Sequence, residues 1–299
     1  MFFRLLGRVQ VENADTSLVI ASAPIRGLLA ALLLEEGRFV TVEQLMGSLW
    51  ESPPDSARKN LRLHVARLRG QLAALDLRER LGTLRGGGGG YRLLAAPEEV
   101  DAIRFKRLTD RGFAELRARS VSTAETTLAE ALKLWQGSIG QDCTASERLR
   151  ARFAAFDELH LTARERLVEA RLCRGRTIEL VPEILDILSA APFRENSWAH
   201  LMRAYYLGGD AAGAISAWDR ATATLGDRLG LDLSAELREL HLSVLRRDDH
   251  AVRGSMAPGP DGRPGPAHPV TVRSHRAAGH RPAPRSRVAL SGPGGCTPV

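Results

Sequence analysis

The sequence predicts a mainly helical chain with a small β component, organised as a basic head, an all-helical middle and a tail without regular structure. Three observations lead there. Short alternating segments and helical stripes fill residues 1–96, helix-spaced apolar residues recur through 98–246, and glycine and proline dominate 250–299. The chain has 299 residues and a formal net charge of +7. That length suits about two domains.

Composition excludes several classes of protein. The longest apolar run covers residues 28–34, far short of the roughly 18–20 residues that span a bilayer. The N-terminus lacks the apolar stretch of a signal peptide. Cys143, Cys173 and Cys296 are too few and too widely spaced for a disulfide framework or a zinc site. We therefore expect a cytoplasmic protein without membrane association, bound metal or cofactor.

The first fifty residues predict strands followed by two helices. Residues 2–20 alternate imperfectly between apolar and polar, which favours two or three short antiparallel strands. Pro24 opens a helix with a leucine stripe, and Gly37 follows its end. Thr41 and Gln44 then fit a capping box at the start of a second helix, which ends at Trp50.

A third helix begins at Asp55 or Ser56, which are both good N-caps. Its apolar residues recur at spacings of 4, 3 and 4 and predict a buried stripe: Leu61, Val65, Leu68 and Leu72. Residues 58–69 hold five Lys and Arg side chains and no acid. Such a helix repels itself unless an anion is present, so polyanion binding is favoured over a merely solvated basic face.

Two short segments around five glycines, 86–90, predict a hairpin after this helix. Short strands, three helices and a C-terminal hairpin form a winged helix-turn-helix. The third helix has the right size for the major groove of DNA.

The head resembles the OmpR/PhoB-type winged helix domain, through residues 61–69 (LRLHVARLR), Arg85-Gly86 and Gly90-Tyr91-Arg92-Leu93. Residues 1–246 resemble the SARP family, the streptomycete antibiotic regulatory proteins. The resemblance implies base contacts by Arg62, Leu63 and Arg67, and phosphate contacts by Trp50, Lys59, Asn60, His64 and Arg69. It implies a wing formed by Thr83, Arg85, Tyr91 and Arg92. The run of five glycines departs from the family, whose wing tip is shorter.

The middle, 98–246, predicts seven helices, at 101–118, 122–135, 145–174, 177–190, 195–208, 210–225 and 233–246. A tetratricopeptide (TPR) pattern is matched by Trp198, Leu201, Tyr205, Ala214, Trp218 and Ala221. We interpret its aromatic residues as core packing. Enzyme motifs such as H-E-x-x-H and G-x-S-x-G are absent from the sequence, so no catalytic residue is expected. By resemblance, this region is a bacterial transcriptional activation domain that supports dimerisation.

The tail, 250–299, is expected to be disordered because it has no repeating apolar face. Residues 288–295 resemble the approach to a phosphate loop but lack its lysine. The resemblance implies a nucleoid-associated activator of an antibiotic gene cluster that binds direct repeats in promoter DNA and recruits RNA polymerase holoenzyme. Two alternatives stay open: a TPR-like protein-interaction module, and a remnant of a larger nucleotide-dependent regulator.

Overall fold

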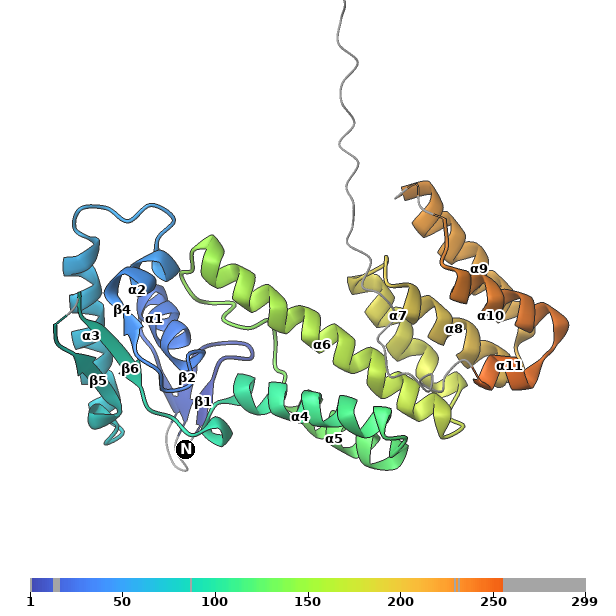
Figure 1. The fold of residues 1–299 in the computed structure, drawn as a ribbon, viewed down its shortest axis with the longest axis horizontal. Coiled ribbons are helices and arrows are strands. Elements are labelled where there is room, and N and C mark those ends of the chain that lie inside the picture. Colours follow the sequence, from blue (N-terminus) through green and yellow to red (C-terminus); the bar gives the residue numbers. More distant parts are fainter. Residues whose placement is uncertain (1, 13–16, 87, 229, 231, 255–299) are drawn as a thin grey trace, which may run out of the picture. The chain divides into compact units, whose positions relative to one another are not determined.

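The computed structural model describes residues 2–12, 17–86, 88–228, 230 and 232–254 (Figure 1). Of the tail expected at 250–299, residues 255–299 lie outside the described residues, and so does the segment that resembles a phosphate loop. Within the described residues, no helix is long and apolar enough to cross a membrane. No cluster of His, Cys, Asp and Glu in that part of the chain could hold a metal ion.

The strands expected near the N-terminus are confirmed. β1 (Phe2–Arg4), β2 (Gln10–Glu12) and β3 (Ser17–Val19) form an antiparallel sheet in sequence order. Phe3 pairs with Val11, and both side chains are fully buried. The alternation that predicted these strands therefore places one side chain of each of these two strands in the core.

The three helices of the head are also confirmed: α1 (Ala23–Leu33), α2 (Val42–Leu49) and α3 (Ala57–Ala73). The capping box at α2 forms as predicted, because the Thr41 Oγ1 accepts from the Gln44 backbone N–H at 3.2 Å and the Gln44 side chain accepts from the Thr41 N–H at 3.0 Å. α3 follows Ser56, but the Ser56 side chain makes no capping bond to the helix backbone.

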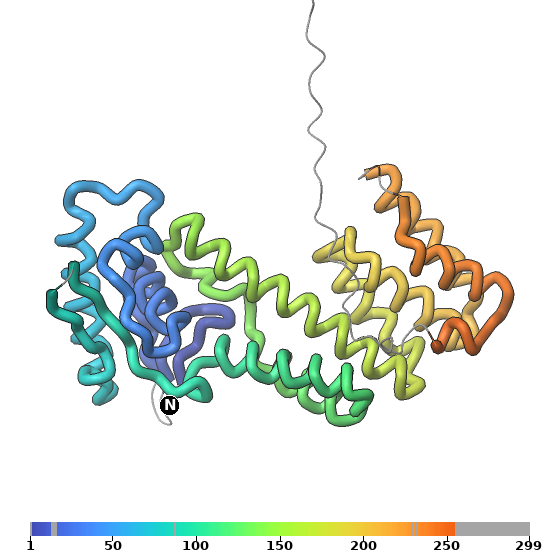
Figure 2. Tube along the Cα trace, viewed as in Figure 1, coloured from blue at the N-terminus to red at the C-terminus, as the bar shows by residue number. Residues whose placement is uncertain are grey.

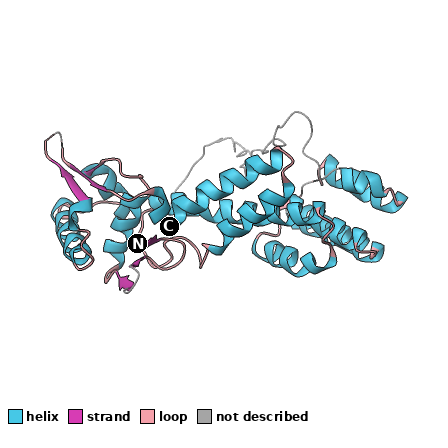
Figure 3. Ribbon diagram, turned by 90° about the horizontal axis from the view of Figure 1, so that it is seen from below, coloured by secondary structure: helices cyan, strands magenta, loops and turns pink. Residues whose placement is uncertain are grey.

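The hairpin consists of β5 (Leu81–Leu84) and β6 (Gly90–Leu93), which are drawn in magenta beside the helices of the head in Figure 3. A third strand, β4 (Val40–Thr41), pairs with β6 and was not expected from the sequence. At the tip, Gly86, Gly88 and Gly89 have φ values of 85°, 90° and 76°. Residues other than glycine rarely adopt this backbone conformation, so the turn depends on the glycine run.

Every predicted helix of the middle is present within a few residues of its expected bounds. They are α4 (Asp101–Arg117), α5 (Val121–Lys133), α6 (Glu147–Cys173), α7 (Val181–Ala190), α8 (Glu195–Leu207), α9 (Ala211–Thr222) and α10 (Ala235–Arg246). Short 3₁₀ turns lie at Arg78–Arg80, Pro97–Glu99 and Ile178–Leu180. A π-helical turn, Ala223–Asp227, extends α9.

The buried side chains form two hydrophobic cores, and α6 contributes to both. Leu149 and Phe153 of α6 belong to a core that includes the whole head together with α4 and α5. Val168 and Leu172 belong to a second core that is built with α7 to α10 and Val252. At 1.5 Å per residue, the 27 residues of α6 extend about 40 Å. Figure 2 shows α6 as a continuous yellow-green helix. The head therefore shares its core with the first helices of the middle, and the division into domains at 1–96 and 98–246 stays a prediction.

The expectation of disorder from residue 250 is wrong for its first residues, which belong to α11 (Asp249–Gly254). Three contacts explain the helix. The Asp248 carboxylate accepts from the Ala251 N–H at 2.9 Å, the Tyr206 hydroxyl donates to Asp249 at 2.6 Å, and Val252 is fully buried in the second core. One buried valine is too weak a periodic signal to predict this helix from the sequence.

Candidate nucleic-acid interface

α3 has one buried face and one exposed face. The predicted stripe is buried, because Leu61, Val65, Leu68 and Leu72 are each at most 2% exposed. Lys59 and Arg67 are exposed on the opposite face and Arg62 on its flank, and Leu63 is 46% exposed. A single exposed leucine is ordinary on a protein surface, so the uncompensated cations around Leu63 are what distinguish this face.

Three cations on this face have no ion-pair partner among the described residues: Lys59, Arg62 and Arg67. α3 contains no acidic residue that could neutralise them. The side chains that we expected to contact bases, Arg62, Leu63 and Arg67, therefore lie together on one exposed surface with the expected phosphate contact Lys59. We call these four residues the α3 face.

Arg58 changes the charge argument made from the sequence. Its guanidinium forms a 2.6 Å ion pair with Glu43 of α2 and donates to the Gly88 carbonyl at the hairpin tip at 3.5 Å. One of the five basic side chains between residues 58 and 69 is thus neutralised by the body of the head. The sequence could not reveal this pair, because Glu43 and Arg58 are 15 residues apart on different helices.

Arg69 lies differently from the other cations. Its guanidinium donates to the Leu81 carbonyl and to the Thr83 Oγ1, both at 3.0 Å. Arg69 therefore holds strand β5 against the C-terminal part of α3, as Arg58 holds the hairpin tip near its N-terminal end. The expected contact between Arg69 and a phosphate stays a prediction. To make that contact, the guanidinium would have to give up its hydrogen bonds to Leu81 and Thr83.

Trp50 and His64 stack on each other, with ring centroids 6.1 Å apart and planes 19° apart. Burial, and then the positive charge of Arg67, lower the pKa of His64. Both effects favour the neutral imidazole over the imidazolium. Asn60, the remaining residue of this group, donates from its side chain to the Ser56 hydroxyl at 3.2 Å.

The predicted wing residues occupy both strands of the hairpin and its tip. Arg85 is exposed at the tip, where its charge is available to a polyanion. Tyr91 is half-buried against the first core. The Arg92 guanidinium lies 4.5 Å from the centroid of the Phe39 ring, a cation–π contact that orients it along the sheet.

The loop between α2 and α3 is fixed at its first residue and exposed throughout residues 51–55. The Glu51 carboxylate accepts from the backbone N–H of Glu147 at 2.6 Å and from the Arg150 side chain. Ser146, the N-cap of α6, donates to the Gly47 carbonyl at 2.6 Å. The N-terminus of α6 is thereby attached to the helix-turn-helix.

The aromatic residues of the middle pack within the protein, as expected. Trp198 is 3% exposed, while Trp135, Tyr205 and Trp218 are half-buried. Trp135 stacks on His160 at 4.1 Å, and Trp218 stacks on His241 at 4.2 Å. Burial and the Arg164 charge lower the pKa of His160 to about 4, so this imidazole is neutral.

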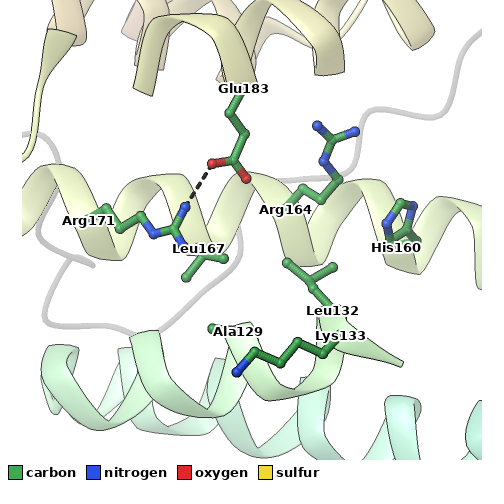
Figure 4. A pocket seen from close by; sticks show the side chains of 8 residues that line it. All are labelled: Ala129, Leu132, Lys133, His160, Arg164, Leu167, Arg171 and Glu183. Atoms are coloured by element: carbon green, nitrogen blue, oxygen red, sulfur yellow. Dashed lines mark hydrogen bonds and ion pairs between the residues drawn. The ribbon is translucent and has the colours of Figure 1, made fainter. Parts of the chain in front are cut away.

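A groove of about 390 Å³ lies between α5, α6 and α7 (Figure 4). Two of the three cationic side chains that line it form ion pairs with acidic residues. Arg171 donates to Glu183 at 2.8 Å, as Figure 4 shows, and Arg164 donates to Asp186 at 2.8 Å. Its lining residues include no nucleophile next to a base. We therefore place the candidate functional site at the α3 face.

Two family models match the chain in tandem. The model described as "Transcriptional regulatory protein, C terminal" matches residues 20–93, and the model described as "Bacterial transcriptional activator domain" matches residues 100–245. The first match contains α3 and the hairpin. The second begins at the start of α4 and includes all seven predicted middle helices.

Known regulators are similar over most of the chain. The transcriptional regulator RedD of Streptomyces coelicolor is 33% identical over 246 residues, which cover 82% of this chain and 70% of RedD. The regulatory protein DnrI of Streptomyces peucetius is 31% identical over 253 residues, covering 83% and 93%. The structure of Mycobacterium tuberculosis EmbR in complex with a low-affinity phosphopeptide matches with a TM-score of 0.78 at 29% identity, covering 86% of this chain and 68% of EmbR.

These matches agree with the winged helix and the helical middle that the structure contains. The relatives are named as regulators of transcription or as regulatory proteins. The chain belongs to the SARP family of transcriptional regulators, in which an OmpR/PhoB-type DNA-binding domain is joined to a bacterial transcriptional activation domain.

Proposed function

We propose that the α3 face reads base edges in the major groove of promoter DNA, with the β5–β6 hairpin against the adjacent backbone. One observation carries the proposal: an exposed, acid-free face presents Lys59, Arg62 and Arg67 around an exposed leucine. Arginine recognises guanine through two parallel hydrogen bonds, and an apolar side chain suits the methyl group of thymine. Leu63 and the arginines thus favour a site that contains both bases.

We also propose that the operator consists of direct repeats and that bound protein recruits RNA polymerase holoenzyme, with a homodimer on the DNA. Family membership supports these steps, and so does the exposure of the loop at residues 51–55. By the same family argument, the controlled genes form an antibiotic or other secondary-metabolite cluster. Asp55→Asn should then lower transcription in a purified polymerase assay while DNA affinity is unchanged.

Footprinting on duplexes that tile the upstream regions of neighbouring genes tests DNA binding directly. Wild-type protein should protect repeated half-sites, and log K should fall linearly with log salt concentration. Arg62→Ala/Arg67→Ala should remove the footprint, whereas Arg117→Ala/Arg119→Ala should retain it, because those arginines lie at the far end of α4. Failure of every duplex to be protected at low salt would contradict the proposal.

A further inference from the structure

We propose that a second groove, beside α7 and α9, binds an acidic segment of a partner protein in which carboxylates alternate with apolar side chains. This groove is separate from the α3 face, so its function holds whether or not α3 reads DNA. It lies in the second core region, which residues of the winged helix do not enter.

The groove has a volume of about 560 Å³ and an apolar floor. Leu185 and Leu188 of α7 and Pro192 of the following turn are among its lining residues. The buried Trp198 fixes this turn, because its indole N–H donates to the Pro192 carbonyl at 2.9 Å. A floor of this kind suits the apolar side chains of an extended segment.

Two arginines also line the groove, and neither has an acidic partner among the described residues. The Arg220 guanidinium lies 5.5 Å from the centroid of the Trp198 ring, and the Arg228 guanidinium lies 5.1 Å from that of Phe193. Cation–π contacts of this kind orient a guanidinium without neutralising it. The residues that line the groove include no Asp or Glu, so carboxylates from outside are the complementary charge.

The groove between α5, α6 and α7 differs in its charges. In the groove of Figure 4, Arg171 and Arg164 are both paired with acidic residues of the chain. Arg228 follows the π-helical turn Ala223–Asp227, and Arg220 precedes it. Such turns are frequent at functional sites because they move side chains out of the regular helical register. The aromatic ring under Arg228, Phe193, is itself 41% exposed and extends the apolar surface.

Fluorescence anisotropy with the full chain tests the proposal. The probe is a fluorescein-labelled hexapeptide of alternating aspartate and leucine, and the reference peptide carries asparagine in place of aspartate. Wild-type protein should bind the aspartate peptide at least tenfold more tightly than the asparagine peptide. Arg220→Gln/Arg228→Gln should abolish this difference. Arg117→Gln/Arg119→Gln, which removes the same charge from the end of α4, should preserve it.

Two further measurements keep the result decisive. Ser189→Glu adds a carboxylate to the groove from the exposed end of α7. It should lower the affinity for the aspartate peptide at least fivefold. This variant tests the groove even if the double arginine variant does not fold. Arg62→Gln/Arg67→Gln should leave peptide affinity unchanged. Equal binding of both peptides by wild-type protein, or loss of binding in Arg62→Gln/Arg67→Gln alone, would overturn the proposal.

Discussion

Lys59 and Arg69 were both expected to contact phosphates, but the structure gives them different surroundings. Lys59 is exposed without a partner among the described residues, whereas Arg69 donates to Leu81 and Thr83 of the hairpin. Lys59→Ala should therefore weaken binding to all sequences alike and reduce the salt slope by about 1, measured by anisotropy at several salt concentrations. Arg69→Ala should mainly lower the melting temperature, because it removes the two hydrogen bonds that hold β5 against α3. A slope reduction of about 1 with an unchanged melting temperature would instead make Arg69 a phosphate contact.

His200 of α8 is buried, and its Nδ1 has no hydrogen-bond partner within the described structure. Burial, followed by the charges of Arg203 and Arg166, lowers the pKa of His200 to about 3. The unfolded chain takes up a proton at this residue below its ordinary pKa near 6.5, and the folded chain does not. The stabilising effect of the neutral form is therefore present above pH 6.5 and is lost as the pH falls toward 3.

The matched variant for this residue is His200→Gln. Between pH 6 and pH 5, the free energy of unfolding of the wild type should fall by roughly 1.2 kcal/mol more than that of the variant, since close to one proton is linked to unfolding. Urea denaturation at each pH measures the difference. Parallel pH profiles would show that His200 is protonated in the folded protein.

At the scale of elements, the sequence predicted the features that depend on residues close together in the chain. The stripe of α3 and the capping box of α2 depend on residues within one or two turns, and both formed as expected. β4 was missed because its pairing of Val40 with Tyr91 joins distant segments. The bonds of Arg58 and Arg69 to the hairpin were missed for the same reason. Spacing along one helix shows which face a side chain occupies, but it does not show which distant residue it meets.

The ion pair between Arg58 and Glu43 joins α3, α2 and, through Gly88, the tip of the hairpin. Glu43→Gln should free Arg58 for a phosphate, so the salt slope of DNA binding should become steeper by about 1. Glu79→Gln is the matched control, because Glu79 is exposed and unpaired among the described residues but carries the same charge. Equal changes in the two variants would attribute the effect to net charge and not to Arg58.

At the scale of the whole molecule, the shared first core predicts that the head and α4–α6 unfold together. Leu149 is fully buried in this core, and Arg152 of the same helix bonds to Glu35 beyond α1 at 2.6 Å. Leu149→Ala should cost about 2–5 kcal/mol. Hydrogen exchange should then quicken in α1 and α3 as well as in α4–α6.

Leu240→Ala is the control for this experiment, because Leu240 is buried in the second core with α8 and α9. It should quicken exchange in α8–α11 and leave α1 and α3 unchanged. If Leu149→Ala left α1 and α3 equally protected, the winged helix would be an independently stable unit despite the common core.

The central claim is that the exposed side of α3 reads DNA sequence, and Arg67→Ala tests it most directly. Affinities of wild-type and variant protein are measured on an operator and on its complete set of single base-pair substitutions. The variant should lose roughly 1–3 kcal/mol on the operator and lose discrimination at one base-pair position, while preferences elsewhere are retained. An unchanged affinity and an unchanged preference at every position would contradict the claim.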